Sequence, residues 1–420
     1  MISRRGVLAA GAAVAAGAVA ASCARWEPAA SGVSQPGGLP DGWVGTWGAP
    51  AGGGEPNTER GLPYKSIRNL LHTNIGGQAV RLRMSNLYGA EPLELRHVTI
   101  ALSAEPNTPA ARPETMRDVT FSGQRTVVVP PGTEVWSDRV DLALPDDADI
   151  LVTTYSTGAS GPVSYHPMAV QFNYMAHGAD LAAEPSAERF VAENSFWRYV
   201  TEVAVLAPEA AGTAVAFGGS STDGSGSTMG GNGRWPDYLG RRLLELPPDR
   251  RMGVYNAGVS ANRLLVDSNQ YGHEGAGKVA LDRLDRDVLD RAAARTLIMA
   301  HGINDLQQPP KVPNTPERLI EQFTKIVDRC HARNVRVVGT TLTPFKFWPS
   351  HNPETERERQ KVNEFVRTSG LFDAVADFAA AVADPNDPEL LRADYDFGDY
   401  LHCNDAGYEA MANSIDLSTL

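Results

Sequence analysis

The alternation of apolar and polar residues changes its period near residue 210. From Trp43 to about Ala207, apolar and polar residues mostly alternate one by one, and Gly, Pro, Asn and Asp interrupt the runs at short intervals. The alternating runs are residues 79–85, 134–143, 150–155 and 199–205. A period of two with frequent turn residues is typical of antiparallel strands that bury one face. The pattern predicts an antiparallel β-sandwich or jelly-roll domain over residues 41–208.

From Thr213 onward, short apolar runs alternate with amphipathic segments of helical period. The apolar runs are Thr213–Phe217, Met252–Tyr255, Arg295–Met299, Val335–Gly339 and Phe372–Val375. The helical segments lie near residues 236–246, 278–291, 316–333, 354–368 and 405–415, the last with Asn404 or Asp405 available to cap it. Such alternation predicts a parallel sheet covered by helices on both faces. We therefore expect an α/β domain over residues 213–420, with the boundary in Ala207–Gly212.

The first 40 residues have the composition of an export signal followed by a linker. Arg4 and Arg5 form a twin-arginine pattern, and a run of small apolar residues follows. Ala20-Ala-Ser-Cys23 resembles a lipobox, so residues 1–23 predict export by the twin-arginine route. Either Cys23 becomes a lipid anchor at the outer face of the cell membrane, or simple cleavage releases an extracellular protein. Residues 24–40 are rich in Pro, Gly, Ser and Ala and predict a flexible linker.

Composition and missing motifs exclude several classes of function. The net charge of −12 disfavours a nucleic-acid surface, which needs basic clusters. The chain has neither His-Glu-x-x-His nor paired Cys-x-x-Cys, and Met229 occupies the position where a dinucleotide fingerprint beginning at Gly224 needs glycine. We expect no cofactor and no metal. Export permits a disulfide between Cys330 and Cys403, but two buried free thiols are the preferred interpretation.

The segment Ala-Val-Ala-Phe-Gly-Gly-Ser-Ser-Thr-Asp-Gly, residues 214–224, combines a buried strand with two serines. A serine at the end of such a strand, ahead of a helix, lies where α/β sheets bind ligands. Ser220 or Ser221 is therefore a candidate nucleophile. Both serines also suit a structural role as cap or turn residues, but the preceding glycines let the backbone turn sharply and leave room for a substrate.

Asp399 and His402 lie three residues apart far downstream. At this spacing a carboxylate can accept a hydrogen bond from an imidazole, which sets the tautomer and stabilises the imidazolium formed during catalysis. Asp394 and Asp396 compete for this role at less suitable spacings. A single histidine is usually structural, yet the combination with a candidate serine predicts a nucleophile, a base and an orienting carboxylate. Other acidic residues, Asp223, Asp305 and Asp377, are expected to be structural.

Two further loops follow predicted strands, at residues 256–262 and 302–305. Gly258 offers a bare backbone N–H, and Asn304 offers a side-chain amide. Together with the N–H of the nucleophilic serine, they predict an oxyanion hole with three donors. Each residue alone suits a turn equally well, but their positions at successive strand ends favour the joint interpretation.

These segments resemble, in the correct order, the motif blocks of the SGNH hydrolases, also called the GDSL esterase/lipase family. The blocks are Gly218–Gly224, Gly258 within Asn256–Ser260, Gly302–Asp305 and Asp399–His402. The resemblance covers roughly residues 213–416. The whole chain, including the β-rich half that starts Gly45-Thr-Trp47, is similar to secreted actinobacterial members.

The resemblance implies a flavodoxin-like three-layer α/β fold and hydrolysis of carboxylic esters, acyl or acetyl, through an acyl-enzyme. By position it assigns the nucleophile to Ser220, the base to His402 and the orienting carboxylate to Asp399. It assigns the oxyanion donors to the backbone N–H groups of Ser220 and Gly258 and to the side chain of Asn304. The implied substrate is a small-molecule or polysaccharide ester, and no oligomeric state is predicted.

Two residues depart from the family pattern. Gly219 occupies the position of an aspartate that usually braces the nucleophile loop, and Cys403 occupies that of a proline. Because that aspartate transfers no proton, we expect the chemistry to survive. An α/β-hydrolase would need Gly-x-Ser-x-Gly, which Thr222 breaks. The remaining alternative, favoured only by Gly219, is a carbohydrate-binding protein with a non-catalytic SGNH-like domain.

Overall fold

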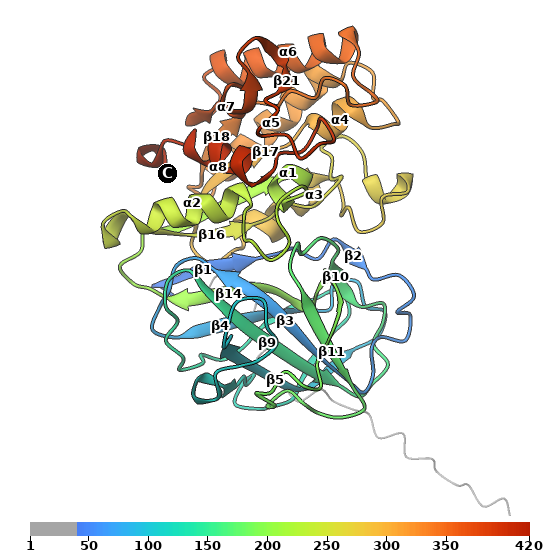
Figure 1. The fold of residues 1–420 in the computed structure, drawn as a ribbon, viewed down its shortest axis with the longest axis vertical. Coiled ribbons are helices and arrows are strands. Elements are labelled where there is room, and N and C mark those ends of the chain that lie inside the picture. The colour runs from blue at the N-terminus through green and yellow to red at the C-terminus, as the bar shows by residue number, and fades with distance from the viewer. Residues whose placement is uncertain (1–39) are drawn as a thin grey trace, which may run out of the picture. The chain divides into compact units, whose positions relative to one another are not determined.

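The computed structural model describes residues 40–420, in which antiparallel sheets precede a parallel sheet (Figure 1). The predicted export signal at residues 1–23, with Cys23, and the linker as far as residue 39 lie outside the described residues. Within the described part of the chain, no helix has the length and apolar character needed to cross a membrane.

The β-rich region contains three antiparallel sheets. The first has the order β1 (Trp43–Gly48), β14 (Val200–Leu206), β4 (Val80–Ser85), β8 (Glu134–Trp136). The second has the order β12 (Val191–Asn194), β11 (Asn173–His177), β3 (Lys65–Thr73), β9 (Ala148–Ser156), β5 (Leu93–Leu102), β6 (Arg117–Asp118), with β7 (Val127–Val129) beside β5. The third has the order β13 (Trp197–Arg198), β10 (Ser164–His166), β2 (Gly53–Gly54). A short 3-10 helix, η1, spans Pro113–Thr115.

One apolar core joins the two larger sheets of this region. In β4, Val80, Leu82 and Met84 are fully buried, whereas the intervening arginines are partly exposed. These three residues share a cluster with Leu71 of β3 and Ile150 of β9, which belong to the second sheet. The period-two pattern therefore corresponds to strands that bury one face against a facing sheet, and the predicted antiparallel β-rich region is confirmed.

The second region contains a five-stranded parallel sheet of order β16-β15-β17-β18-β19. Its strands are β15 (Gly212–Gly218), β16 (Met252–Asn256), β17 (Ala294–Ala300), β18 (Arg336–Thr340) and β19 (Ala374–Ala376). Its helices are α1 (Ser220–Asp223), α2 (Trp235–Leu244), α3 (Ala280–Leu284), α4 (Ile303–Gln307), α5 (Thr315–His331), α6 (Pro353–Thr368), α7 (Phe378–Val382) and α8 (Asp405–Asn413). Shorter elements are η2 (Pro248–Arg250), η3 (Ser268–Tyr271), the π-helical η4 (Asp285–Leu289), η5 (Leu417–Thr419) and the hairpin β20 (Ala383–Asp384) and β21 (Asp387–Leu391).

Helices cover both faces of this parallel sheet. Along β15, Val215 and Phe217 belong to one buried cluster, and Ala214 and Ala216 belong to another. The first cluster includes side chains of α3, α5 and α6, and the second includes side chains of α2, α7 and α8. Successive residues of a strand point to opposite faces, so each cluster fills one face of the sheet. The predicted flavodoxin-like three-layer fold is confirmed.

The β-rich region covers the edge strand β16, and the two regions form one compact unit. A Cβ placed on Gly253 of β16 would lie 1.8 Å from the carbonyl oxygen of Gly45 in β1, so the two backbones touch. The side chain of Asn74 donates to the carbonyl of Val254 at 2.8 Å and accepts from its N–H at 3.1 Å. At Val254 this amide takes the place of a neighbouring strand, because it satisfies both the backbone N–H and the backbone carbonyl of that residue.

A buried charge network fastens the same junction. Arg291, after η4, bonds Glu202 of β14 at 3.1 Å and Asp287 at 3.3 Å. Arg83 of β4 adds contacts to Glu202 at 3.4 Å and to Glu134 at 3.0 Å. Burial raises the pKa of the Asp287 carboxyl, but the surrounding arginines outweigh burial and keep that pKa below its ordinary value. Asp287 is therefore ionised within the network.

The two cysteines of the described chain are free and buried, as predicted. Cys330 lies on α5, and Cys403 packs against the face that includes α2 and α8. Burial raises the pKa of both thiols to about 12. Both are therefore protonated at neutral pH, so the cysteine beside His402 is a poor nucleophile.

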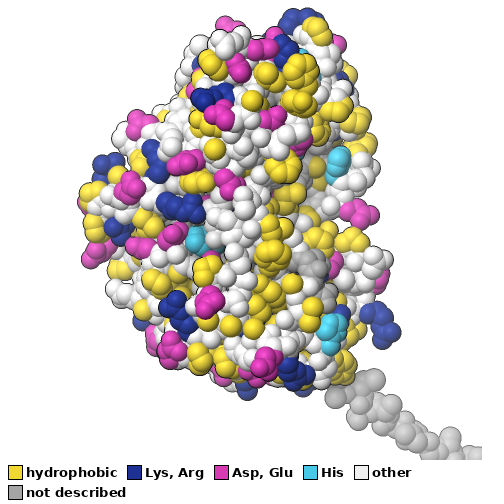
Figure 2. Space-filling model, viewed as in Figure 1, with side chains coloured by type: hydrophobic (Ala, Val, Ile, Leu, Met, Phe, Trp, Pro, Cys, Tyr) yellow, Lys and Arg dark blue, Asp and Glu magenta, His cyan; other side chains and the backbone are white. Residues whose placement is uncertain are grey.

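The surface carries charges of both signs. On the face shown in Figure 2, acidic and basic side chains are interspersed over both regions, and the basic side chains do not merge into one broad patch. This distribution agrees with the acidic net charge of −12.

Replacing Arg291 by leucine is expected to lower the free energy of unfolding by about 3 kcal/mol, because buried carboxylates lose a partner. Urea unfolding followed by tryptophan fluorescence measures the loss. The control is Arg139→Met, because Arg139 and its partner Asp141 are 48% and 85% exposed and should contribute little. Equal stabilities of the two variants would show that the network does not stabilise the junction.

Candidate active site

Ser220 begins the one-turn helix α1, directly after strand β15 and two glycines. A Cβ on Gly218 would lie 2.1 Å from Thr222 Oγ1 and 2.9 Å from the carbonyl oxygen of Ala300, so only glycine fits the turn. The strand order reverses between β15 and its neighbours, and Ser220 lies at the carboxyl end of β15, where ligands bind in such sheets.

Ser220 and His402, 182 residues apart in sequence, are in direct contact. The Ser220 hydroxyl lies 2.8 Å from His402 Nε2, and His402 Nδ1 lies 2.6 Å from Asp399 Oδ2. Because the carboxylate only accepts, Nδ1–H donates to it, and Nε2 is left to accept the serine proton. The structure thus brings together the three residues predicted as nucleophile, base and orienting carboxylate.

The alternatives weighed from the sequence have other partners. The hydroxyl of Ser221 interacts with the phenol of Tyr408, which also donates to the carbonyl of Ser225. Asp394 pairs with Arg392 at 2.7 Å. Asp396 accepts from the backbone N–H groups of Gly398 and Tyr400. The geometry therefore favours Ser220 over Ser221, and Asp399 over both competing carboxylates.

Asp399 is held as an ionised acceptor. Its Oδ1 accepts from the N–H groups of Leu401 at 2.9 Å and His402 at 2.8 Å, while Oδ2 accepts from the imidazole. Burial raises the pKa of Asp399, but these hydrogen bonds outweigh burial and lower it to about 2. The carboxylate is thus charged at neutral pH, as an acceptor for Nδ1–H must be.

Asn304, in the first turn of α4, presents its amide nitrogen to the nucleophile turn. Its Oδ1 accepts from the side chains of Gln307 at 2.9 Å and Gln308 at 3.0 Å, and its Nδ2 donates to the carbonyl of Asn262 at 3.0 Å. These bonds set the orientation of the amide. A Cβ on Gly219 would lie 2.8 Å from Asn304 Nδ2, so this donor is next to the residue that precedes Ser220.

Gly258 packs against α1, but its N–H already has a partner. A Cβ on Gly258 would lie 2.5 Å from the backbone nitrogen of Asp223, a distance that excludes any other residue. The Gly258 N–H donates to Asn256 Oδ1 at 2.9 Å, and Asn256 Nδ2 donates to the carbonyl of Thr222 at 2.8 Å. An oxyanion would have to share or replace the bond to Asn256 to use this donor.

Aromatic side chains lie beside His402. The ring centroid of Trp348 is 6.3 Å from that of His402, and Trp348 Nε1 donates to Gln307 Oε1 at 2.5 Å. Phe347 and Tyr400, 63% and 44% exposed, meet edge to face at 5.5 Å. Both have positive φ, 75° and 67°, which is uncommon for aromatic residues and concentrates at functional sites. The pair forms an exposed aromatic surface on the two loops that carry Trp348 and His402.

The residues that orient Asn304 were missed in the sequence, although a signal for two of them exists. Gln307 and Gln308 follow Asn304 at helical spacings of three and four, which brings side chains together on one helix face. Asn262, in contrast, lies in a different loop, and its contact with Asn304 depends on the sheet order. Within the described chain, no group of His, Cys, Asp and Glu is arranged to hold a metal ion.

Comparisons with known proteins point to one family for the α/β region. The profile of the GDSL-like lipase/acylhydrolase family matches residues 216–410. The chain is similar to a solved protein of the G-D-S-L family from Desulfitobacterium hafniense, with 16% identity over 50% of this chain and 99% of that chain and a TM-score of 0.38. It is also similar to a GDSL-like lipase from Bacteroides thetaiotaomicron, with 16% identity over 49% of this chain and 87% of that chain and a TM-score of 0.36. A lipase/acylhydrolase from Enterococcus faecalis is 20% identical over 48% of this chain and 92% of that chain, with a TM-score of 0.36. No curated protein matches the chain.

Gly219→Ala is expected to lower kcat about tenfold to a hundredfold, because the added Cβ displaces the Asn304 amide by a fraction of an ångström to an ångström. The φ of Gly219 is −94°, which alanine can adopt, so the contact is the main effect. Steady-state hydrolysis of p-nitrophenyl acetate measures it. Gly158→Ala is the control, since a Cβ there meets no atom within 4 Å. Equal kcat in both variants would mean that the space beside Gly219 is not critical.

Proposed function

We propose that this chain, whose residues 216–410 match the GDSL-like lipase/acylhydrolase family, hydrolyses carboxylic esters through an acyl-enzyme on Ser220. The family expected from the sequence blocks is thereby confirmed. The observation that carries the proposal is the continuous contact from the Ser220 hydroxyl through His402 to Asp399. Nucleophilic ester hydrolysis needs this chain of groups in this order.

In the proposed mechanism, Ser220 Oγ attacks the ester carbonyl while His402 Nε2 takes its proton. Asp399 stabilises the imidazolium, which then protonates the leaving alcohol. Water repeats the attack on the acyl-enzyme, with His402 again acting first as base and then as acid. The first proton transfer uses the 2.8 Å contact between Nε2 and the Ser220 hydroxyl. In the later steps Nε2 exchanges the proton with the leaving alcohol, with the attacking water and finally with the released Ser220 hydroxyl.

The oxyanion formed in each step is proposed to accept from the N–H of Ser220 and from the side chain of Asn304. The fixed orientation of the Asn304 amide supports this role, because preorganised donors need no rearrangement in the transition state. Gly258 is proposed as a third donor that joins when its bond to Asn256 is shared or exchanged.

For the substrate, we propose an acyl or acetyl ester of a small molecule or a polysaccharide. The exposed pair Phe347 and Tyr400 beside His402 supports an accessible binding surface at which part of an ester can stack. We also propose that the protein is exported by the twin-arginine route, either free outside the cell or lipid-anchored through Cys23. That proposal depends only on the sequence of residues 1–23.

Ser220→Ala is expected to abolish hydrolysis of p-nitrophenyl acetate and labelling by a fluorophosphonate, with the fold unchanged by circular dichroism. The matched control is the neighbouring Ser221→Ala, which should keep most of the activity because Ser221 faces Tyr408. Loss of activity only in Ser221→Ala would move the nucleophile by one residue. A wild-type protein that neither turns over esters nor accepts the label would support the non-catalytic, carbohydrate-binding alternative.

Asn304→Ala is expected to lower kcat by about 10² to 10³ with little change in KM, because an oxyanion donor acts mainly in the transition state. Asn352→Ala serves as a control for destabilisation, since it removes the N-cap of α6 and costs about 1 kcal/mol of stability without touching the site. An unchanged kcat in Asn304→Ala would remove this side chain from the oxyanion hole.

A further inference from the structure

Strand β10 and the loop after it reach the loops that carry the candidate catalytic residues. We call residues 164–170 the clamp segment. Its contacts with the α/β region include hydrogen bonds from Gly230 N–H to the Val170 carbonyl at 3.0 Å, from the Arg234 guanidinium to the Ala169 carbonyl, and from the Ser225 hydroxyl to Met168 Sδ at 3.1 Å. The oxygen of Ser260 also lies 3.2 Å from this sulfur. The clamp segment therefore contacts several loops around Ser220, and Asn107 of the β-rich region adds a hydrogen bond to the Gly230 carbonyl at 3.1 Å.

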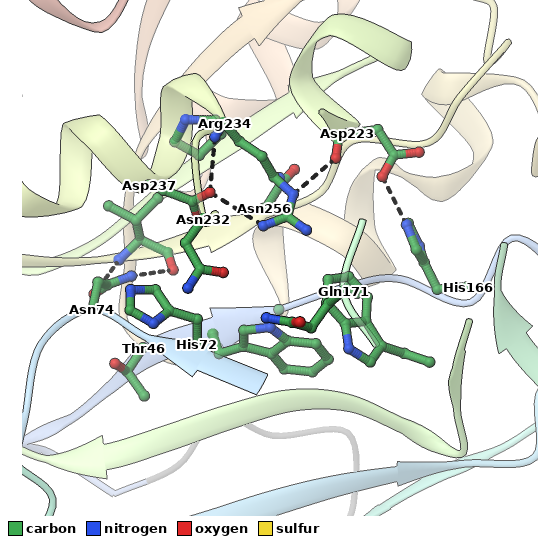
Figure 3. Close-up of a pocket in the computed structure, with 16 residues that line it drawn as sticks. Thr46, His72, Asn74, His166, Gln171, Asp223, Asn232, Arg234, Asp237 and Asn256 are labelled. Carbon is green, nitrogen blue, oxygen red and sulfur yellow. Dashed lines mark hydrogen bonds and ion pairs between the residues drawn. The ribbon is translucent and has the colours of Figure 1, made fainter. Parts of the chain in front are cut away.

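His166 makes the most specific of these contacts. Its Nδ1 lies 2.8 Å from the carbonyl oxygen of Pro50. Its Nε2 lies 2.8 Å from Asp223 Oδ1 (Figure 3). A carbonyl and a carboxylate both accept, so both ring nitrogens donate and the side chain is an imidazolium. His166 and Asp223 are 2% and 3% exposed, so the ion pair is shielded from water.

Asp223 connects His166 to α1, which begins at Ser220, and to the loop that contains Gly258. It is the last residue of α1, the helix that Ser220 begins. Its second oxygen, Oδ2, accepts from the N–H and the hydroxyl of Ser260, each at 2.7 Å. Ser260 follows Gly258, so one carboxylate joins α1 to the loop of the candidate oxyanion donor.

The surroundings of the pair favour its charged form. Burial lowers the pKa of His166, but Asp223 and the Pro50 carbonyl outweigh burial and raise it above the ordinary value. Arg234 also faces the pair, and its charge lowers the pKa of His166 without reversing the net rise. Its Nε donates to the backbone carbonyl of Asp223 at 3.1 Å, and its guanidinium lies over the Trp197 ring. His166 packs against the same ring at 5.6 Å. The ion pair is thus enclosed by groups from both regions.

We propose that His166 is a positioning residue for ester hydrolysis: its imidazolium holds Asp223, which fixes α1, and thereby Ser220, against the Gly258–Ser260 loop. This inference depends on the proposed function. It makes the β-rich region a working part of the catalytic centre, because the region supplies the cation that bonds the Asp223 carboxylate, whereas Arg234 bonds only the backbone carbonyl of Asp223. Asp223, expected from the sequence to be merely structural, then links the two regions.

The test compares His166→Leu, which removes both donors, with His166→Gln, which keeps an N–H donor near the position of Nε2. The matched control is His72→Leu. His72 is also a histidine held by two carboxylates, Asp147 and Asp149 at 2.9 and 2.8 Å, but it has no contact with α1. Full-length variants are assayed for kcat and KM with p-nitrophenyl acetate, and their thermal unfolding is recorded.

We expect His166→Leu to lower kcat about tenfold or more with KM changed less than about threefold, because small misplacements of a reacting group mainly slow the chemical step. His166→Gln should recover most of kcat, and His72→Leu should keep the wild-type kcat even if it unfolds at a lower temperature. The double variant His166→Leu/Asp223→Asn should be no slower than Asp223→Asn alone, because the two residues act as one unit.

A wild-type kcat in His166→Leu, or a loss matched by His72→Leu, would overturn the inference, and so would additive losses in the double variant. If His166→Leu does not fold, His166→Gln and Asp223→Asn carry the same comparison. Failure of the proposed function is recognised separately, by an inactive wild-type protein. In that case crystal structures decide: the distance from Ser220 Oγ to His402 Nε2 should exceed about 3.5 Å in His166→Leu, and an unchanged distance would refute positioning.

Discussion

The free edge of the parallel sheet is the constraint around which the two regions are arranged. Strand β16 would leave a row of unpaired backbone groups in water, and β1, together with the side chain of Asn74, covers it instead. The close approach needs glycine at position 253, where a Cβ would lie 1.8 Å from the carbonyl oxygen of Gly45. The ionic network around Arg291 lies at the same junction. Strand β10 reaches the turn that carries Ser220 through the contact between His166 and Asp223.

The site itself is built from short loops whose side chains are oriented by their neighbours. Asn304 is held by two glutamines and a backbone carbonyl, and Asp399 is held by two backbone N–H groups as well as the imidazole. Such bonds hold the reacting groups in place before the substrate arrives, which is the main source of electrostatic catalysis. The strained backbone of Phe347 and Tyr400 beside the imidazole belongs to the same pattern, because rigid surroundings must maintain it.

The long, periodic elements of the fold were predictable, and the short ones were not. The segments 316–333 and 354–368 correspond to α5 and α6, whose apolar faces repeat over several turns. The segment 278–291 divides into α3 and the π-helical η4, and the one-turn elements α1, α4 and α7 went unpredicted. One helical turn contains too few residues to establish a period, so its formation depends on capping and on the strand it follows.

The sequence by itself determined the order of the blocks, the strand and helix periods, and the local pair Asp399 and His402, because three residues in a turn fix their own proximity. The resemblance assigned the nucleophile to Ser220, and the tertiary structure added that its hydroxyl meets the imidazole, that Ser221 meets Tyr408, and that the Gly258 N–H is bonded to Asn256. The tertiary structure alone revealed the pairing of His166 with Asp223, 57 residues apart. Contacts of this kind have no sequence period, since they form only when separate sheets pack together. A charge buried by that packing is stable only next to an opposite charge.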